Sequence, residues 1–276
     1  MSIIAHADDD LYFINPSISD ALHEGKCLQT VVTTAGYFGR PDNEKRVAGL
    51  QAAYAQMVGA KNEWQGSIVT IAGKPVQRFV LSADPRVVLS FLNLPCSVHD
   101  QLSAAPYRSL HQLYSEGGET FTTTVVPKTI YNKDDWRKVY TGLMHEMQPM
   151  SIYTLEPDSS FPVRLTKPTG EGSHPDHVFV AKTVTDAVRE YGRPLSINYF
   201  LDYPLYDQPI NLNAEQGARK HAAMHAYCTS DTTACNSVTP NTLCAATTEL
   251  PWGEAWLCRQ RVRSVLLNAE PKKIME

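Results

Sequence analysis

Two short segments of the sequence combine histidine with carboxylates at spacings that could bind a metal ion. The first, at residues 5–10, reads Ala-His-Ala-Asp-Asp-Asp and follows a short apolar run. Adjacent carboxylates repel one another, and a divalent cation would compensate that repulsion. His6 and Asp9, three residues apart in a tight turn, could converge on one ion while Asp8 points elsewhere. The alternative is an acidic helix N-cap, in which the carboxylates complement the helix dipole.

The second segment, at residues 174–177, reads His-Pro-Asp-His. Pro175 suits the first turn of a helix, so His174 and His177 would stand at positions i and i+3 and could face one point. Asp176 between them could orient a histidine by accepting its ring N–H. Two histidines at this spacing also occur by chance, so this segment alone is not specific.

The two segments together make a stronger signal than either alone. His6, Asp9 and one of the downstream histidines would supply two nitrogens and one oxygen with an open position, which suits catalytic zinc. Such an ion lowers the pKa of its water towards about 7 and polarises a carbonyl. Asp8 would remain as a general base, and the unliganded histidine could stabilise an oxyanion or protonate a leaving amine. These are the parts needed for metal-assisted amide hydrolysis.

The elements that position these segments alternate between short apolar runs, typical of strands, and amphipathic stretches, typical of helices. This alternation predicts an α/β fold, a single Rossmann-like domain over residues 1–276 whose mostly parallel sheet has helices on both faces. Such sheets bind ligands at the carboxyl ends of their strands, where both segments are expected.

Individual elements are expected from the apolar pattern and the turn residues between them. The middle of the chain, 66–130, is expected to be a hairpin-containing insertion that shapes the substrate pocket. We expect strands over 1–5, 27–34, 86–92, 151–155 and 195–201, a hairpin over 66–81 turning at Gly73 and Lys74, and helices over 16–25, 42–59, 132–147, 174–191 and 213–227.

Composition excludes other classes of protein. The 276 residues carry a formal net charge of -4 and no basic run, so binding to nucleic acid is not expected. No stretch approaches the ~20 apolar residues that span a membrane. The six cysteines could form disulfides or none. Nothing in the sequence indicates an oligomeric state.

The two segments resemble the signatures of the LmbE-like, or PIG-L, family of zinc-dependent N-deacetylases. These enzymes remove acyl groups, usually acetyl, from amino sugars and their conjugates. The resemblance covers residues 3 to about 262 and implies the Rossmann-like fold of the family. It is also carried by residues 8–16, by Gly25-Lys26-Cys27 running into a β-branched strand, by the helix and turn over 46–64 and by residues 255–260.

The resemblance implies a role for each polar residue of the two segments. Zinc would be bound by His6, Asp9 and His177, although this ligand set also accepts other divalent ions. Asp8 would be the general base. His174 would stabilise the oxyanion or act as the acid, with Asp176 orienting it.

Substrate contacts are less clearly implied. Arg46 aligns with an arginine that contacts substrate in relatives, but Val47 replaces the glutamate that usually follows it, which puts that role in question. Ala7 stands where most members have proline, at a position that supplies no ligand. Tyr37, Phe38 and Trp64 could stack on a sugar ring, or they could be ordinary packing residues.

The resemblance implies an N-acetylated sugar or glycoconjugate, such as an N-acetylglucosamine derivative, as substrate. Two alternatives remain: an amidase acting on a non-sugar conjugate, and a carbohydrate-binding member without turnover. The presence of all six polar site residues favours an enzyme.

The resemblance also bears on the cysteines and on the compartment. It implies a disulfide between Cys235 and Cys244, in a Ser/Thr/Asn-rich loop. Members with this type of N-terminal signature are commonly exported, which slightly favours a secreted or extracytoplasmic protein over a cytoplasmic one.

Overall fold

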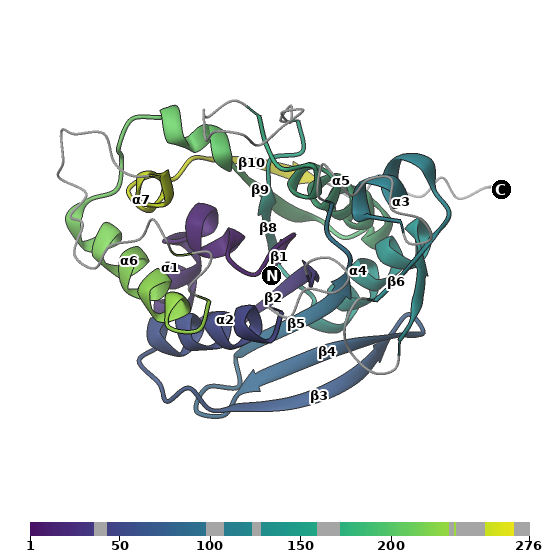
Figure 1. The fold of residues 1–276 in the computed structure, drawn as a ribbon, viewed down its shortest axis with the longest axis horizontal. Coiled ribbons are helices and arrows are strands. Elements are labelled where there is room, and N and C mark those ends of the chain that lie inside the picture. The colour runs from purple at the N-terminus through teal and green to yellow at the C-terminus, as the bar shows by residue number, and fades with distance from the viewer. Residues whose placement is uncertain are drawn as a thin grey trace.

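A computed structural model describes residues 1–35, 43–97, 108–122, 128–158, 172–231, 235 and 252–267. Its main feature is an eight-stranded sheet, beside a separate antiparallel pair made of β6 (Glu119–Phe121) and β7 (Ile130–Asn132) (Figure 1). The strands of the large sheet are β1 (Ser2–Ile4), β2 (Leu28–Thr34), β3 (Trp64–Ile71), β4 (Lys74–Leu81), β5 (Val87–Leu94), β8 (Ser151–Leu155), β9 (Leu195–Phe200) and β10 (Val262–Leu267).

The large sheet has the order β10-β9-β8-β1-β2-β5-β4-β3. Its five central strands, from β9 to β5, are parallel, which confirms the predicted mostly parallel α/β sheet. The predicted hairpin is β3 and β4, which pair antiparallel with each other and extend the main sheet beyond β5. The hairpin turns at Ala72 and Gly73, both with positive φ, one residue earlier than predicted.

Helices lie on both faces of this sheet (Figure 1). The five predicted helices are confirmed, and α7 overlaps residues 255–260, where the resemblance implies the family's C-terminal helix, whereas α3, the π-helical turn and the 3-10 turn were not predicted. None of the helices in the described ranges has the length and apolar character needed to cross a bilayer. The helical elements are the π-helical turn η1 (Asp10–Ile14), α1 (Ser17–His23), α2 (Asn43–Met57), α3 (Leu110–Glu116), α4 (Lys133–Met147), α5 (Pro175–Tyr191), the 3-10 turn η3 (Tyr203–Asp207), α6 (Ala214–Cys228) and α7 (Trp252–Leu257).

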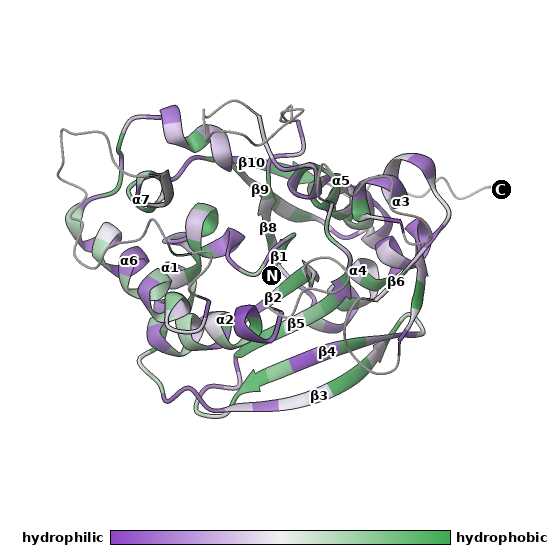
Figure 2. Cartoon of the chain, in the orientation of Figure 1, coloured by the Kyte–Doolittle hydropathy of each residue, from purple (hydrophilic) through white to green (hydrophobic). Residues whose placement is uncertain are grey.

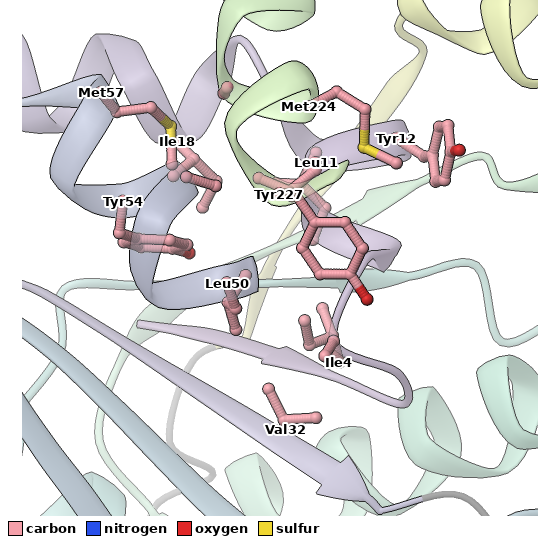
Figure 3. Packing of buried hydrophobic residues seen from close by; sticks show 14 of the residues in the cluster. Ile4, Leu11, Tyr12, Ile18, Val32, Leu50, Tyr54, Met57, Met224 and Tyr227 are labelled. Carbon is pink, nitrogen blue, oxygen red and sulfur yellow. The ribbon is translucent and has the colours of Figure 1, made fainter. Parts of the chain in front are cut away.

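The alternation of side chains along the strands divides the apolar core into two clusters. In β1, Ile3 and Ile4 are both fully buried but belong to different clusters, because successive side chains point to opposite faces of a sheet. One cluster packs η1, α1, α2, α6 and α7 against the sheet, and part of it is seen in Figure 3. The other packs α3, α4 and α5 against the opposite face. Hydrophobic residues accordingly run along β2 and β5 between the two layers (Figure 2).

The disulfide prediction is wrong. Cys235 is bonded to Cys228 and not to Cys244, because Cys228 ends α6 and the chain returns to within 5.6 Å of it, measured between Cα atoms. This separation lies in the ordinary disulfide range. Cys258 is also disulfide-bonded, to a partner outside the described residues, and Cys27 and Cys96 are free.

A glycine lies at the crossing of α2 and α6 and gives a stability prediction. A Cβ at Gly49 would lie 2.8 Å from the carbonyl oxygen of Tyr227 and 2.9 Å from its ring. Alanine usually stabilises a helix by about 1 kcal/mol over glycine, but here the clash must separate two packed helices. Gly49→Ala is therefore expected to lower the free energy of unfolding by about 1–3 kcal/mol.

Urea denaturation followed by circular dichroism measures this effect. Gly66→Ala at an exposed position of β3 is the control, because its Cβ would meet only the edge of the Phe79 ring, at 3.1 Å. It should destabilise less than Gly49→Ala. Equal unfolding free energies for the two variants would contradict the close helix contact at Gly49.

Candidate active site

The side chains of the candidate site come from the carboxyl ends of four parallel strands. His6, Asp8 and Asp9 follow β1, and Cys96 and Ser97 follow β5. His174, Asp176 and His177 stand at the start of α5, the helix that links β8 to β9. Asp202 follows β9. The topology thus brings both sequence segments to one end of the sheet, where open α/β sheets bind their ligands.

Three donor atoms face one another at this point. Asp9 Oδ1 lies 3.0 Å from His177 Nε2 and 3.4 Å from His6 Nδ1, and the two histidine nitrogens lie 3.2 Å apart. Ligands about 2.0–2.1 Å from a tetrahedral zinc ion lie about 3.3 Å from each other. The predicted ligand set therefore has the spacing of a zinc site. His174 offers a further nitrogen within 4.8 Å of those of His6 and His177.

Hydrogen bonds orient Asp9 and His177 towards this point. Asp9 Oδ2 accepts from the backbone amides of Ala5, at 3.1 Å, and His6, at 2.7 Å, which leaves Oδ1 to face the histidines. His177 Nδ1 lies 2.7 Å from the fully buried carboxylate of Asp202, which also accepts from Ser173 Oγ. A carboxylate on Nδ1 keeps the proton there and leaves the Nε2 lone pair for a metal.

Asp176 orients both remaining histidines, in two different ways. Its Oδ2 lies 3.2 Å from His6 Nε2 and accepts from the Ser97 amide at 2.9 Å, so the carboxylate pairs with His6. The carboxylate is 3.7 Å from His174 Nδ1, beyond hydrogen-bond distance. It is the backbone N–H of Asp176 that donates to His174 Nδ1, at 3.1 Å, and makes His174 the N-cap of α5.

The electrostatics of the cluster favour a positive charge beside Asp9. Burial alone would raise the pKa of Asp9, but His177 and His6 hold that pKa well below its usual range. Burial alone would lower the pKa of His177, but the Asp9 and Asp202 carboxylates raise it to about 9. Burial lowers the pKa of His174 to about 3, so this ring is neutral and its Nε2 carries the proton.

Asp8 and Arg46 interact electrostatically next to this cluster. Burial raises the pKa of the Asp8 carboxyl, and the Arg46 guanidinium opposes that shift. Arg46 Nε lies 3.4 Å from Asp231 Oδ2, which also accepts from Tyr227 Oη at 2.9 Å. Asp231 thus supplies the acidic neighbour that Val47 does not, and Arg46 is held beside Asp8 by a residue remote in sequence.

Of the predicted aromatic contacts, Trp64 is not brought to the site. Trp64 begins β3 and pairs with Leu81, the last residue of β4. Because β4 runs antiparallel to β5, this end of β4 lies beside the amino end of β5. Trp64 therefore lies at the end of the sheet opposite to the site. Its indole N–H donates to Asn62 Oδ1 at 2.8 Å. Tyr37 and Phe38 lie outside the described residues.

The sequence reasoning missed four site residues: Asp202, Ser97, Cys96 and Asp231. A signal existed for Asp202, because it follows the predicted strand 195–201 directly, at the end of the sheet where the site was expected. Cys96 and Ser97 lie four and five residues beyond the end of the strand predicted over 86–92, at the same end of the sheet. Asp231 lies beyond α6 and had no such signal.

The position of Asp202 makes a testable prediction. Replacing Asp202 with asparagine removes the charge that fixes the His177 tautomer, so we expect zinc affinity to fall about 10- to 100-fold. Isothermal titration with zinc measures this, and Asp207→Asn, at an exposed residue of η3, is the control. Unchanged affinity in Asp202→Asn would show that Asp202 does not orient a ligand.

The chain is similar to several solved deacetylases in overall fold. It shares 17% sequence identity with the A40926 pseudoaglycone deacetylase Dbv21, over 98% of each chain, with a TM-score of 0.49. It shares 13% with the zinc-inhibited form of the teicoplanin deacetylase Orf2, over 82% of each chain, with a TM-score of 0.47. It also shares 13% with the conserved protein TT1542 from Thermus thermophilus, over 84% of this chain and 80% of that one, with a TM-score of 0.42.

Family membership is assigned from the sequence and not from these distant structures. No curated protein sequence matches the chain. The sequence model of the PIG-L family, described as GlcNAc-PI de-N-acetylase, matches residues 1–188, which include both histidine-containing segments. The chain therefore belongs to the PIG-L family of N-deacetylases.

Proposed function

We propose that the protein is a zinc-dependent hydrolase that releases acetate from an N-acetylated amino sugar or glycoconjugate. The observation that carries this proposal is the triangle of His6 Nδ1, Asp9 Oδ1 and His177 Nε2, with sides of 3.0–3.4 Å. Two groups suited to proton transfer and oxyanion binding, Asp8 and His174, flank this triangle. Membership of the PIG-L family supports the same reaction.

His6, Asp9 and His177 would hold the metal ion. A divalent ion bound there would lower the pKa of its water and polarise the amide carbonyl. Asp8 interacts electrostatically with Arg46, Asp9 and His6. Its half-buried carboxylate is placed to accept the proton of the attacking water and to return it to the leaving amine.

His174 supplies a neutral hydrogen-bond donor. Because its Nδ1 accepts from the Asp176 amide, its Nε2–H is free to donate to the oxygen on which negative charge develops. Placement at the N-cap of the 17-residue α5 keeps this ring in one orientation. Arg46, held by Asp231, is placed to contact a polar group of the substrate next to the reacting amide.

Acetate release from a panel of substrates tests the proposal. The zinc-loaded protein would be given free N-acetylglucosamine, its oligomers, an N-acetylglucosaminyl glycolipid and a simple N-acetyl amino acid, with Asp8→Asn as the inactive control. Release from a sugar-containing substrate is the expected result. Release only from the N-acetyl amino acid would identify a non-sugar amidase, and sugar binding without any release would identify a non-catalytic member.

We further propose that the protein works in an oxidising compartment outside the cytoplasm. The Cys228–Cys235 disulfide and the disulfide at Cys258 support this, because such bonds persist in oxidising environments. Free-thiol titration of the denatured protein, purified without reductant, should find fewer than six thiols. Six free thiols would contradict the proposal.

A further inference from the structure

A second group of side chains that could bind a metal shares one residue, His6, with the triangle of His6, Asp9 and His177. It consists of His6, Cys96 and Asp176, whose ligand atoms all lie within 4.8 Å of one another. Cys96 is a free, half-buried cysteine that follows β5, and its side chain lies within hydrogen-bonding reach of the His6 ring. None of the steps proposed for acetate release uses this thiol.

The two groups lie on opposite edges of the His6 ring. His6 Nδ1 faces His177 at 3.2 Å and Asp9 at 3.4 Å, whereas His6 Nε2 faces Asp176 at 3.2 Å. A neutral imidazole has one lone pair, because its other nitrogen carries the proton. His6 can therefore serve the first group with Nε2–H donating to Asp176, or serve the second group from Nε2, but it cannot serve both at once.

The ligands of the second group differ in kind from those of the first. A thiolate, an imidazole and a carboxylate suit zinc, and the sulfur adds a preference for softer ions. Cadmium is the softer d¹⁰ relative of zinc and therefore the sharpest probe. The three ligand atoms already lie within 4.8 Å of one another, so closing the group around an ion requires no change of fold.

We propose that His6, Cys96 and Asp176 form a second, thiolate-containing site for soft divalent ions, which inhibits the enzyme by withdrawing His6 from the first site. On binding, a metal–sulfur bond replaces a metal–water bond, and the thiol proton of Cys96 passes to the buffer. The proton of His6 moves from Nε2 to Nδ1, and nothing is oxidised or reduced. Inhibition of turnover rests on the proposed deacetylase function, whereas binding does not.

Cadmium titration tests this site with a readout that is independent of activity. A cadmium–thiolate bond has a charge-transfer absorption in the ultraviolet, so the zinc-loaded wild-type protein should gain this band as cadmium is added. The matched control is Cys27→Ser, because Cys27 is also free but is exposed and lies at the start of β2, away from the site. Cys96→Ser and Cys96→Ala would be compared with it, with circular dichroism to select the variant that folds.

The expected result is a band in the wild-type protein and in Cys27→Ser, and no band in the Cys96 variants. The cadmium concentration that halves acetate release should rise at least about tenfold in the Cys96 variants, each measured against its own uninhibited rate. A band that persists without Cys96, or no band in the wild-type protein, would overturn the second site. If the band depends on Cys96 but no substrate releases acetate, the metal site stands and the proposed function fails instead.

Discussion

Replacing His177 with alanine is expected to abolish stoichiometric zinc binding and reduce acetate release to background. His177 Nε2 completes the triangle with Asp9 and His6, and the ring is fully buried between Asp9 and Asp202. Its loss leaves two ligands and two buried carboxylates without a cation between them. Zinc affinity should fall by more than about 100-fold, beyond the effect expected for removing a residue, such as Asp202, that hydrogen-bonds to a ligand.

Metal analysis after dialysis, together with isothermal titration, measures this loss. His225→Ala is the matched control, because His225 is an exposed histidine of α6 outside the site. It should retain wild-type zinc content and turnover. Equal zinc content in His177→Ala and the wild-type protein would show that the ligand assignment is wrong.

Replacing Asp8 with asparagine is expected to lower the turnover number by about 10²- to 10⁴-fold, the range for loss of a general acid–base group. Zinc content should be unchanged, because Asp8 is outside the triangle of donor atoms. The substrate concentration for half-maximal rate should change little, since the proton is transferred after binding. Steady-state kinetics with a metal assay on the same sample separates these effects.

Asp10→Asn is the control for Asp8→Asn. Asp10 also belongs to the acidic run and is buried, but it accepts from Tyr54 Oη at 2.5 Å, and burial raises its pKa to about 7. An amide there replaces a group that is already partly neutral, so turnover should stay within a few-fold of wild type. Retained turnover in Asp8→Asn, or its loss together with zinc, would remove Asp8 as the base.

The central part of the fold and the metal ligands could be predicted because both are local signals. Strands β1 and β2 are buried on both faces, and β2 is recognisable by its β-branched residues. One histidine-containing segment directly follows a predicted strand, and the other begins a predicted helix. Open α/β sheets bind ligands at the carboxyl ends of their strands, so both segments were expected at that end of the sheet. The helix start at Asn132 was also predictable, because asparagine is a preferred N-cap residue. In the structure its side chain accepts from the Asp135 amide.

Other features depend on contacts between distant parts of the chain. β10 is largely exposed and exists because it pairs with β9, so its own pattern is weak. Trp64 was an attractive sugar-binding residue by type, but strand order places it at the opposite end of the sheet. Cysteine spacing could not identify the partner of Cys235, because the end of α6 sets it.

The polar residues that orient His177 and Arg46 also depend on contacts between distant parts of the chain. Asp202 and Asp231 act on His177 and Arg46 over separations of 25 and 185 residues (231 minus 46) in the sequence. In the sequence, Asp202 is indicated only by its place after a predicted strand, and Asp231 is not indicated at all. Their roles depend on the sheet bringing β9 next to β8, and on α6 packing against α2.

Reconstitution of the metal-free protein with zinc tests the central claim most directly. Acetate release from an N-acetylated sugar substrate should be absent after chelation. It should then return in proportion to added zinc up to about one equivalent, the stoichiometry of a single three-ligand site. Undiminished acetate release by the chelated protein would contradict the account.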